Sequence, residues 1–279
     1  MEYRIPIDQW ADFIINYLRI NYRSFFRSIS GVIESFVTGF EGLLLVVPVI
    51  IVVAIVVAIA WKMAGRGVAL FTLAGFLLLL SMNLWDQTAR TLALVLTSTV
   101  IALAIGIPLG ILASRSDPTE RIIRPILDLM QTMPIFVYLL PAVMFFGIGP
   151  VPAVIATVVF AMPPAIRLTN LGIRQVPAEM TEASIAFGST PMQMLTKVQL
   201  PLALPSIMAG VNQCIMLSLS MAVIASMIGA GGLGAVVYRA ITRLEIGSGF
   251  EGGLAVVIIA IILDRITQSV GKGTTRKVN

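Results

Sequence analysis

The sequence predicts an all-α integral membrane protein of about seven transmembrane helices, preceded by an amphipathic helix. Of its 279 residues, 58% are hydrophobic and 12% are charged, whereas soluble domains average about 45–50% and about 25%. The mean hydropathy is +0.97, and the apolar runs approach the roughly 20 residues that cross a bilayer. So few polar side chains could not cover a soluble surface of this size, which excludes a soluble enzyme, a disordered chain and a nucleic-acid-binding domain.

The residue types that most enzymes use are scarce. The chain has no histidine and one cysteine, Cys214, which removes the commonest general base, the commonest metal ligand and any internal disulfide. We therefore expect no catalytic residue, metal or cofactor in this chain.

Residues 1–42 are expected to form an extracytoplasmic amphipathic tail. From Trp10 to Phe40 apolar residues recur at helical spacing, while Arg19, Arg23, Arg27 and Glu34 occupy another stripe. A helix lying in the membrane interface fits this pattern, and a helix packed on neighbouring segments is the alternative.

Seven apolar runs predict the spans: 43–61, 67–85, 91–113, 126–148, 151–166, 204–228 and 252–266. The first two form a peripheral pair within residues 43–84, and the others lie in a core of residues 85–270. The fifth run is short and is expected to end at Pro163 and Pro164. Prolines inside or beside spans predict bent helices that act as hinges, since proline removes a backbone hydrogen bond; they are Pro108, Pro134, Pro141, Pro163, Pro164 and Pro205.

Basic residues set the expected orientation, because short cytoplasmic loops are rich in Lys and Arg. One side of the seven spans holds Lys62, Arg66, Arg115, Arg121, Arg124, Arg167, Arg174, Lys197, Arg265, Lys272, Arg276 and Lys277, and the opposite loops hold Arg90, Arg239 and Arg243. The richer side is assigned to the cytoplasm, together with a basic tail at residues 271–279. The N-terminus then lies outside, although Arg4, Arg19, Arg23 and Arg27 there oppose the rule.

Glycine patterns that resemble nucleotide sites have simpler interpretations. Residues 229–234 fit G-x-G-x-x-G, but they follow a membrane span and not a strand, so a tight turn is predicted. Gly271-Lys272-Gly273-Thr274 lacks the preceding glycine of a phosphate loop. Gly106 and Gly110 predict close helix packing.

A polar segment at residues 175–200 predicts two short capped helices on the cytoplasmic side. Pro177 can begin a helix over residues 178–187, and Gly188 can end it in a left-handed conformation. Thr190 and Pro191 then begin a second helix, which is expected to stop before Pro201.

This segment resembles the E-A-A-x3-G-x9-I-x-L-P loop of ABC importer permeases. Here it reads Glu182-Ala183-Ser184, three residues, Gly188, nine residues, Val198-Gln199-Leu200-Pro201, departing only at Ser184 and Val198. From about Trp85 to Val270 the chain is similar to the glycine betaine/proline betaine permeases. The segments that carry this similarity are Met130–Tyr138, Phe145–Gly149, Pro163–Arg167, Met208–Gln213 and Ile224–Leu233.

The resemblance implies the transmembrane domain of a type I ABC importer in the cytoplasmic membrane, carrying an osmoprotectant. It implies a second copy of this chain, cytoplasmic ATP-binding subunits that bind ATP and Mg, and an extracytoplasmic substrate-binding protein. By position, Glu182, Ala183, Ser184 and Gly188 would dock on the ATPase. Phe187, beside them, would supply apolar packing at the same contact.

Mildly polar residues in the spans are candidates for the translocation pathway, or alternatively for helix–helix hydrogen bonds: Gln131, Thr132, Asn212, Gln213, Ser218 and Ser220. Quaternary ammonium recognition usually uses an aromatic cage, and no outward cluster of three aromatics is evident, so the cage is expected in the binding protein. Asp128 and Asp264, at cytoplasmic span ends, are interpreted as interfacial anchors.

Three alternatives remain. A secondary transporter would need a mid-span acid or base, and an intramembrane enzyme would need paired carboxylates or histidine; the mid-span regions offer neither. An ABC permease for choline, carnitine or an amino acid is the closest competitor.

Overall fold

The computed structural model describes residues 6–275, and every regular element in that range is a helix. This confirms the predicted all-α class. The part of the predicted basic tail at residues 276–279, like Arg4, lies outside the described residues.

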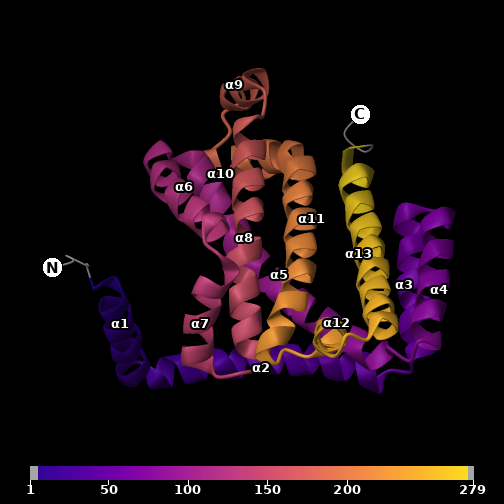
Figure 1. The fold of residues 1–279 in the computed structure, drawn as a ribbon. Coiled ribbons are helices and arrows are strands. Elements are labelled where there is room, and N and C mark those ends of the chain that lie inside the picture. Colours follow the sequence, from indigo (N-terminus) through magenta and orange to yellow (C-terminus); the bar gives the residue numbers. More distant parts are fainter. Residues whose placement is uncertain (1–5, 276–279) are drawn as a thin grey trace.

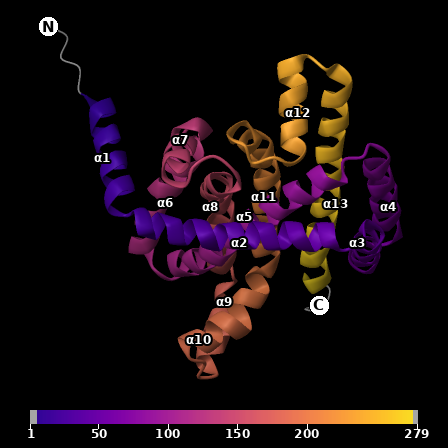
Figure 2. The same cartoon turned by 90° about the horizontal axis from the view of Figure 1, so that it is seen from below.

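Two helices form the N-terminal arm, α1 (Ile7–Asn21) and α2 (Arg23–Val46). Figures 1 and 2 show α2 lying across the ends of the upright helices, on the face opposite α9. It buries Ile33 and Val37, and its Glu41 carboxylate pairs with Arg90 of α5 at 3.1 Å. The arm therefore has the expected amphipathic helix, and one of its faces is packed on the bundle.

The upright segments are joined alternately at the two faces of the molecule (Figure 1). They are α3 (Val49–Ala64), α4 (Arg66–Ser81), α5 (Trp85–Arg115), the pair α6 (Asp117–Thr132) and α7 (Ile135–Phe146), α8 (Pro150–Arg174), α11 (Leu200–Ala225) and α13 (Ile246–Thr275). Each of the predicted spans matches one of these segments.

Length and apolarity alone qualify five of the described helices as spans, or six if α6 and α7 count as one. Those five include α2, which lies crosswise, whereas α3 and α4 have 16 residues each and are about 24 Å long at 1.5 Å per residue. The first span begins at Val49 and not at Leu43, because the chain is extended at Val47 and Pro48.

Proline acts differently at its several positions. The chain breaks at Met133 and Pro134, where α6 and α7 meet at 94°. Other prolines lie inside continuous helices: Pro108, Pro125, Pro141, Pro163, Pro164 and Pro205. The prediction that the fifth span ends at Pro163 and Pro164 is wrong, because both are buried between packed neighbours that keep α8 helical to Arg174.

The centre of the bundle is α8, packed between α5 and α11. A Cβ added at Gly106 would lie 3.2 Å from Ala165 Cβ, and one added at Gly110 would lie 2.6 Å from Thr169 Cβ. Gly210 of α11 approaches the carbonyl oxygen of Pro164 in the same way. The predicted role of Gly106 and Gly110 in close packing is confirmed.

Gly110→Ala should destabilise the bundle by about 1–3 kcal/mol, because its methyl group would also lie 2.8 Å from Ile166 O. The thermal unfolding midpoint in detergent, followed by exposure of the buried Cys214 thiol to a thiol-reactive dye, measures this. Gly253→Ala of α13 is the control, since nothing lies within 4 Å of the added Cβ. Equal midpoints for the two variants would contradict close packing as the role of Gly110.

Candidate coupling site

A short helix projects from one end of the bundle (Figure 1). It is α9 (Ala178–Ala186), which begins after Pro177. Gly188 has φ +75°, and its N–H donates to Ile185 O at 2.8 Å while Ser189 N–H donates to Ser184 O at 3.1 Å. The structure confirms the predicted helix and its glycine end. Pro177 and Gly188 flank α9 and fix where the helix begins and where it ends.

The next helix, α10 (Pro191–Met194), begins with a complete capping box. Gln193 N–H donates to the Thr190 hydroxyl and Thr190 N–H donates to the Gln193 side chain. A π-helical segment, η1 (Leu195–Gln199), then runs directly into α11. The prediction that this helix stops before Pro201 is wrong. Pro201 lies in the first turn of α11, directly after the wider π turn, which gives the helix room for a residue without N–H.

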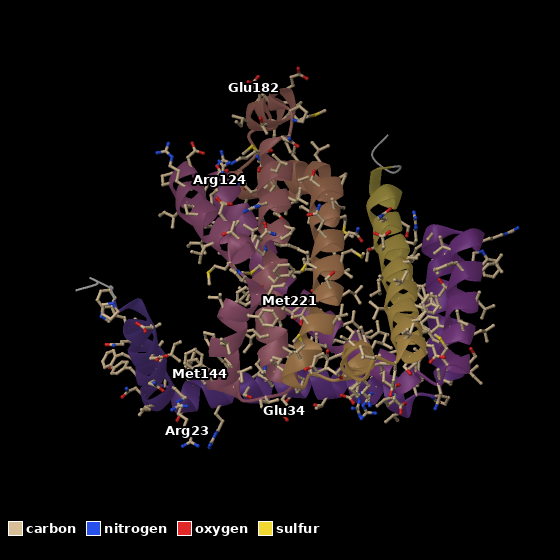
Figure 3. All side chains as sticks on the ribbon, viewed as in Figure 1. Arg23, Glu34, Arg124, Met144, Glu182 and Met221 are labelled. Carbon is tan, nitrogen blue, oxygen red and sulfur yellow. The ribbon has the colours of Figure 1, made fainter. Side chains whose placement is uncertain are left out.

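The outer surface of α9 presents apolar side chains beside two exposed acidic residues, Glu179 and Glu182. Phe187 is 91% exposed, Ile185 62% and Met180 51%, and Figure 3 shows Glu182 at the tip of the projection. Ala183 is exposed, whereas Ser184 is buried with no hydrogen-bond partner for its hydroxyl among the described residues. No group of three potential metal ligands occurs within residues 6–275. The projection therefore presents exposed apolar side chains together with carboxylates.

Arg174, the last residue of α8, ties the base of α9 to two other helices. Its guanidinium pairs with Asp117 Oδ1 at 2.7 Å and Glu120 Oε2 at 3.0 Å on α6, and donates to Ala113 O of α5 at 3.0 Å. Nearby, Arg115 at the end of α5 donates to Pro191 O of α10 at 3.0 Å. The base of α9 is therefore tied to α5 and α6 through the last residue of α8.

A second polar contact links α8 to α6, farther from α9. Arg167 pairs with Asp128 at 2.5 Å and donates to Gln131 Oε1 at 2.9 Å. Between the two contacts lies a cavity of about 370 Å³, lined also by Arg124 and Asn170. Thus α6, the helix that precedes the 94° break, is held to α8 along the α9 face of the bundle.

The candidate pathway residues do not converge on one site. Asn212 donates to Asp264 of α13 at 2.9 Å, and Ser218 accepts a hydrogen bond from Thr99 of α5 at 3.3 Å. These two residues make helix–helix hydrogen bonds. The others lie at the surface or near it: Gln131 on Arg167, Thr132 bonded within α6, and Gln213 and Ser220 exposed on α11.

Sequence reasoning missed the polar cluster around Asp264. Its carboxylate accepts hydrogen bonds from Asn212 and from Gln268 at 2.7 Å, and the Thr267 hydroxyl donates to Asn212 Oδ1 at 2.6 Å. The cluster joins α11 to α13 and replaces the expected interfacial anchor. The spacing of Asp264, Thr267 and Gln268 on one helix face was the available signal.

The glycines at residues 229–234 form a turn, as predicted. Gly229, Gly231 and Gly232 have φ between +72° and +84°, and α12 (Gly232–Arg243) follows. The Leu233 N–H donates to Thr91 Oγ1 at 2.8 Å, so the turn packs on α5. No strand precedes it anywhere in the described chain, and a dinucleotide site needs one.

One expectation about aromatic residues is wrong. On the face opposite α9, Phe26 of α2 stacks on Phe145 of α7 with ring centroids 4.5 Å apart, and its ring meets Phe146 edge-on at 5.4 Å. The chain therefore does gather three aromatics on the face opposite α9, which the charge pattern predicts to be the outer one. They are distant in sequence, so periodicity could not reveal the cluster.

Comparison with known proteins places this arrangement in a family. The model of the binding-protein-dependent transport system inner membrane component matches residues 106–276. The chain is 54% identical over 267 residues to the glycine betaine transport system permease protein OpuAB of Bacillus subtilis, covering 96% of this chain and 95% of that one. It is 50% identical over 275 residues to the glycine betaine/proline betaine permease ProW of Escherichia coli, covering 99% and 78%.

Two further comparisons extend the match. The chain is 51% identical to the glycine betaine/carnitine transport permease protein GbuB of Listeria monocytogenes over 96% of each chain. Among solved structures, an inward-facing MetNI methionine ABC transporter matches with a TM-score of 0.58 and 26% identity, covering 68% of this chain and 93% of that one. The chain belongs to the binding-protein-dependent transport system inner membrane component family. The predicted fold and the resemblance to betaine permeases are confirmed.

Arg174→Ala should lower the free energy of unfolding by about 1–2 kcal/mol, because three partners on α5 and α6 lose a charged donor. Arg174→Lys should recover part of this, since a single ammonium cannot reach all three. Arg121→Ala, an exposed residue of α6, serves as control in the same thermal unfolding assay. If Arg174→Ala and Arg121→Ala unfold alike, Arg174 does not clamp these helices.

Proposed function

We propose that this chain is the permease subunit of an ATP-driven importer for osmoprotectants of the glycine betaine/proline betaine type. The observation that supports this choice of substrate is the 54% identity to a glycine betaine permease over 96% of the chain. Two copies would form the translocation pathway, with ATP and Mg bound by separate ATPase subunits and the substrate delivered by an external binding protein.

Coupling to the ATPase would run through α9. Glu182, Ala183, Ser184, Phe187 and Gly188 would seat the helix in a groove of the ATPase. An exposed ion pair at Glu182 contributes about 1 kcal/mol or less, whereas burying a ring such as that of Phe187 contributes about 1.5–3 kcal/mol. Apolar packing around Phe187 would therefore supply most of the docking energy.

The contacts at the base of α9 suggest how its motion reaches the pathway. Arg174 would carry it to α5 and α6, and η1 would carry it along α11. Because α6 ends at the break before Pro134, a movement of α6 against α7 would open or close the pathway at the bend. Gln131, Thr132, Gln213 and Ser220 would line the pathway, while Asn212 and Ser218 hold α11 to its neighbours.

The distribution of basic residues between the two faces supports an orientation in the membrane. The α9 face would be cytoplasmic and would carry the C-terminus, because α13 ends on that face (Figure 1). The arm would then lie outside with the N-terminus. Arg115 and Arg174 stand at helix ends on the α9 face, and Arg121 and Arg124 lie in the first half of α6, in agreement with the positive-inside rule.

Carnitine is the second candidate cargo, because the permease from Listeria monocytogenes bears both substrates in its name. Reconstitution with the cognate ATPase and binding protein separates the two. Uptake of labelled glycine betaine should require ATP, and glycine betaine should stimulate ATP hydrolysis more than carnitine, choline or an amino acid. ATP-independent uptake would overturn the proposed mechanism, and stimulation by carnitine alone would overturn the cargo.

Phe187→Ser should abolish uptake and prevent co-purification of the ATPase subunits. The side chain is 91% exposed, so the thermal unfolding midpoint of the permease should not change. Ile246→Ser alters a side chain of similar exposure, 88%, at the opposite end of the bundle, and should leave ATPase association intact. Full co-purification of the ATPase with Phe187→Ser would exclude this residue from the contact.

A further inference from the structure

The arm carries arginines whose location the transport mechanism does not explain. Figure 3 shows Arg23 at the face opposite α9, near Met144 and far from Glu182. Arg19 and Arg23 are exposed, and neither makes an ion pair within residues 6–275. Such residues at the outer end of a membrane bundle oppose the positive-inside rule, so an anion from outside the chain is their natural partner.

Both arginines line one hollow of about 470 Å³ between the arm and α7. It is formed by Arg19 and Ile20 from α1, Arg23 and Phe26 from α2, and Met144 and Phe145 from α7. The chain leaves helical geometry at Tyr22, with φ −113° and ψ 24°. This elbow brings the end of α1 and the start of α2 to the same hollow.

The hollow is lined by two guanidinium groups and by apolar side chains, a combination that suits an amphiphilic ligand. Guanidinium groups recognise phosphate through paired hydrogen bonds, while Ile20, Met144 and the aromatic ring of Phe145 offer hydrocarbon. The ring of Phe26 is held by Phe145, with which it is nearly parallel at 9°, so this wall is rigid. A free anion would leave the apolar half of the hollow unfilled.

The surroundings place the hollow beside lipid. Next to it, α1 exposes a stripe of large apolar residues that needs an apolar neighbour: Trp10 (58%), Phe13 (71%), Ile14 (55%), Tyr17 (54%) and Ile20 (70%). The residues that line the hollow come from the end of α1, the start of α2 and the end of α7, and Figures 1 and 2 show these segments at the face opposite α9. A helix with one apolar face and an arginine stripe lies at the headgroup level of a bilayer, where phosphates are found.

We propose that this hollow binds a phospholipid of the leaflet opposite α9. The phosphate lies between Arg19 and Arg23, and an acyl chain lies on Ile20, Met144 and Phe145. Because the hollow is closed on one side by α7, the far half of the broken span, the lipid contacts the arm and a segment beyond the 94° bend at once.

Native mass spectrometry of the intact chain, purified in detergent and titrated with phosphatidylglycerol, tests this proposal. Arg19→Gln combined with Arg23→Gln should retain one fewer phosphatidylglycerol per subunit and bind it at least tenfold more weakly. Arg27→Gln should match the unaltered chain, since Arg27 is exposed on the same helix and does not line the hollow. Arg19→Lys with Arg23→Lys should restore part of the binding.

Two further probes identify the source of the anion. Dioleoylglycerol, which lacks phosphate, and inorganic phosphate, which lacks acyl chains, should each fail to protect the chain against thermal unfolding, whereas phosphatidylglycerol should protect it. The lipid-free unfolding midpoint of the double glutamine variant should equal that of the unaltered chain, because both side chains are exposed. Unchanged lipid retention in that variant overturns the proposal.

Other occupants give other outcomes, each of which overturns the proposal. Protection by inorganic phosphate alone would mean a simple anion site. A change in subunit number of the double glutamine variant would mean that a second copy of the chain covers the hollow. Loss of binding-protein affinity with normal lipid retention would mean that the arginines dock that protein.

Discussion

The close approach of α5 and α8 is the contact on which the rest of the structure depends. Gly106 and Gly110 let the two backbones meet at Ala165 and Thr169, and in a lipid environment such packing replaces the hydrophobic effect as the force between helices. The same approach brings the end of α8 beside the end of α5, so that Arg174 reaches Ala113 O. The projection of α9 from a fixed base is thus a consequence of small residues buried one to three turns away.

Local signals were sufficient to predict both ends of α9 and the start of α10, whereas tertiary packing determined features that local signals did not predict. Pro177, Gly188 and Thr190 act within a few residues of themselves, and the helix ends they predicted are those observed. Pro163 and Pro164 do not end their span, because α5 and α11 surround them and hold α8 helical. Pro134 does break its span. The Phe26–Phe145 stack joins residues remote in sequence, which no periodic pattern reveals.

A polar residue in a span can line a pathway or hold two helices together, and the residue type alone does not distinguish these roles. Asn212 and Ser218 resembled pathway residues, yet each satisfies a partner on another helix, as expected where no water competes for hydrogen bonds. Asp264 is the clearest case, since two amide donors hold its carboxylate between α11 and α13. Gln213 and Ser220 differ from these structural residues because their side chains are exposed. Exposure depends on the folded structure, so the sequence pattern did not reveal this difference.

The π segment η1 sets the angle around the helix axis at which α9 and α10 stand relative to α11. Each residue of an α-helix advances about 100° around the axis, and η1 contains a wider turn between α10 and α11. Removing one residue there would turn α10 and α9 by about that angle relative to α11. Phe187 would then face a different direction relative to the bundle, although every local cap remained intact. The number of residues in η1, the five from Leu195 to Gln199, therefore sets the direction in which α9 points from the bundle.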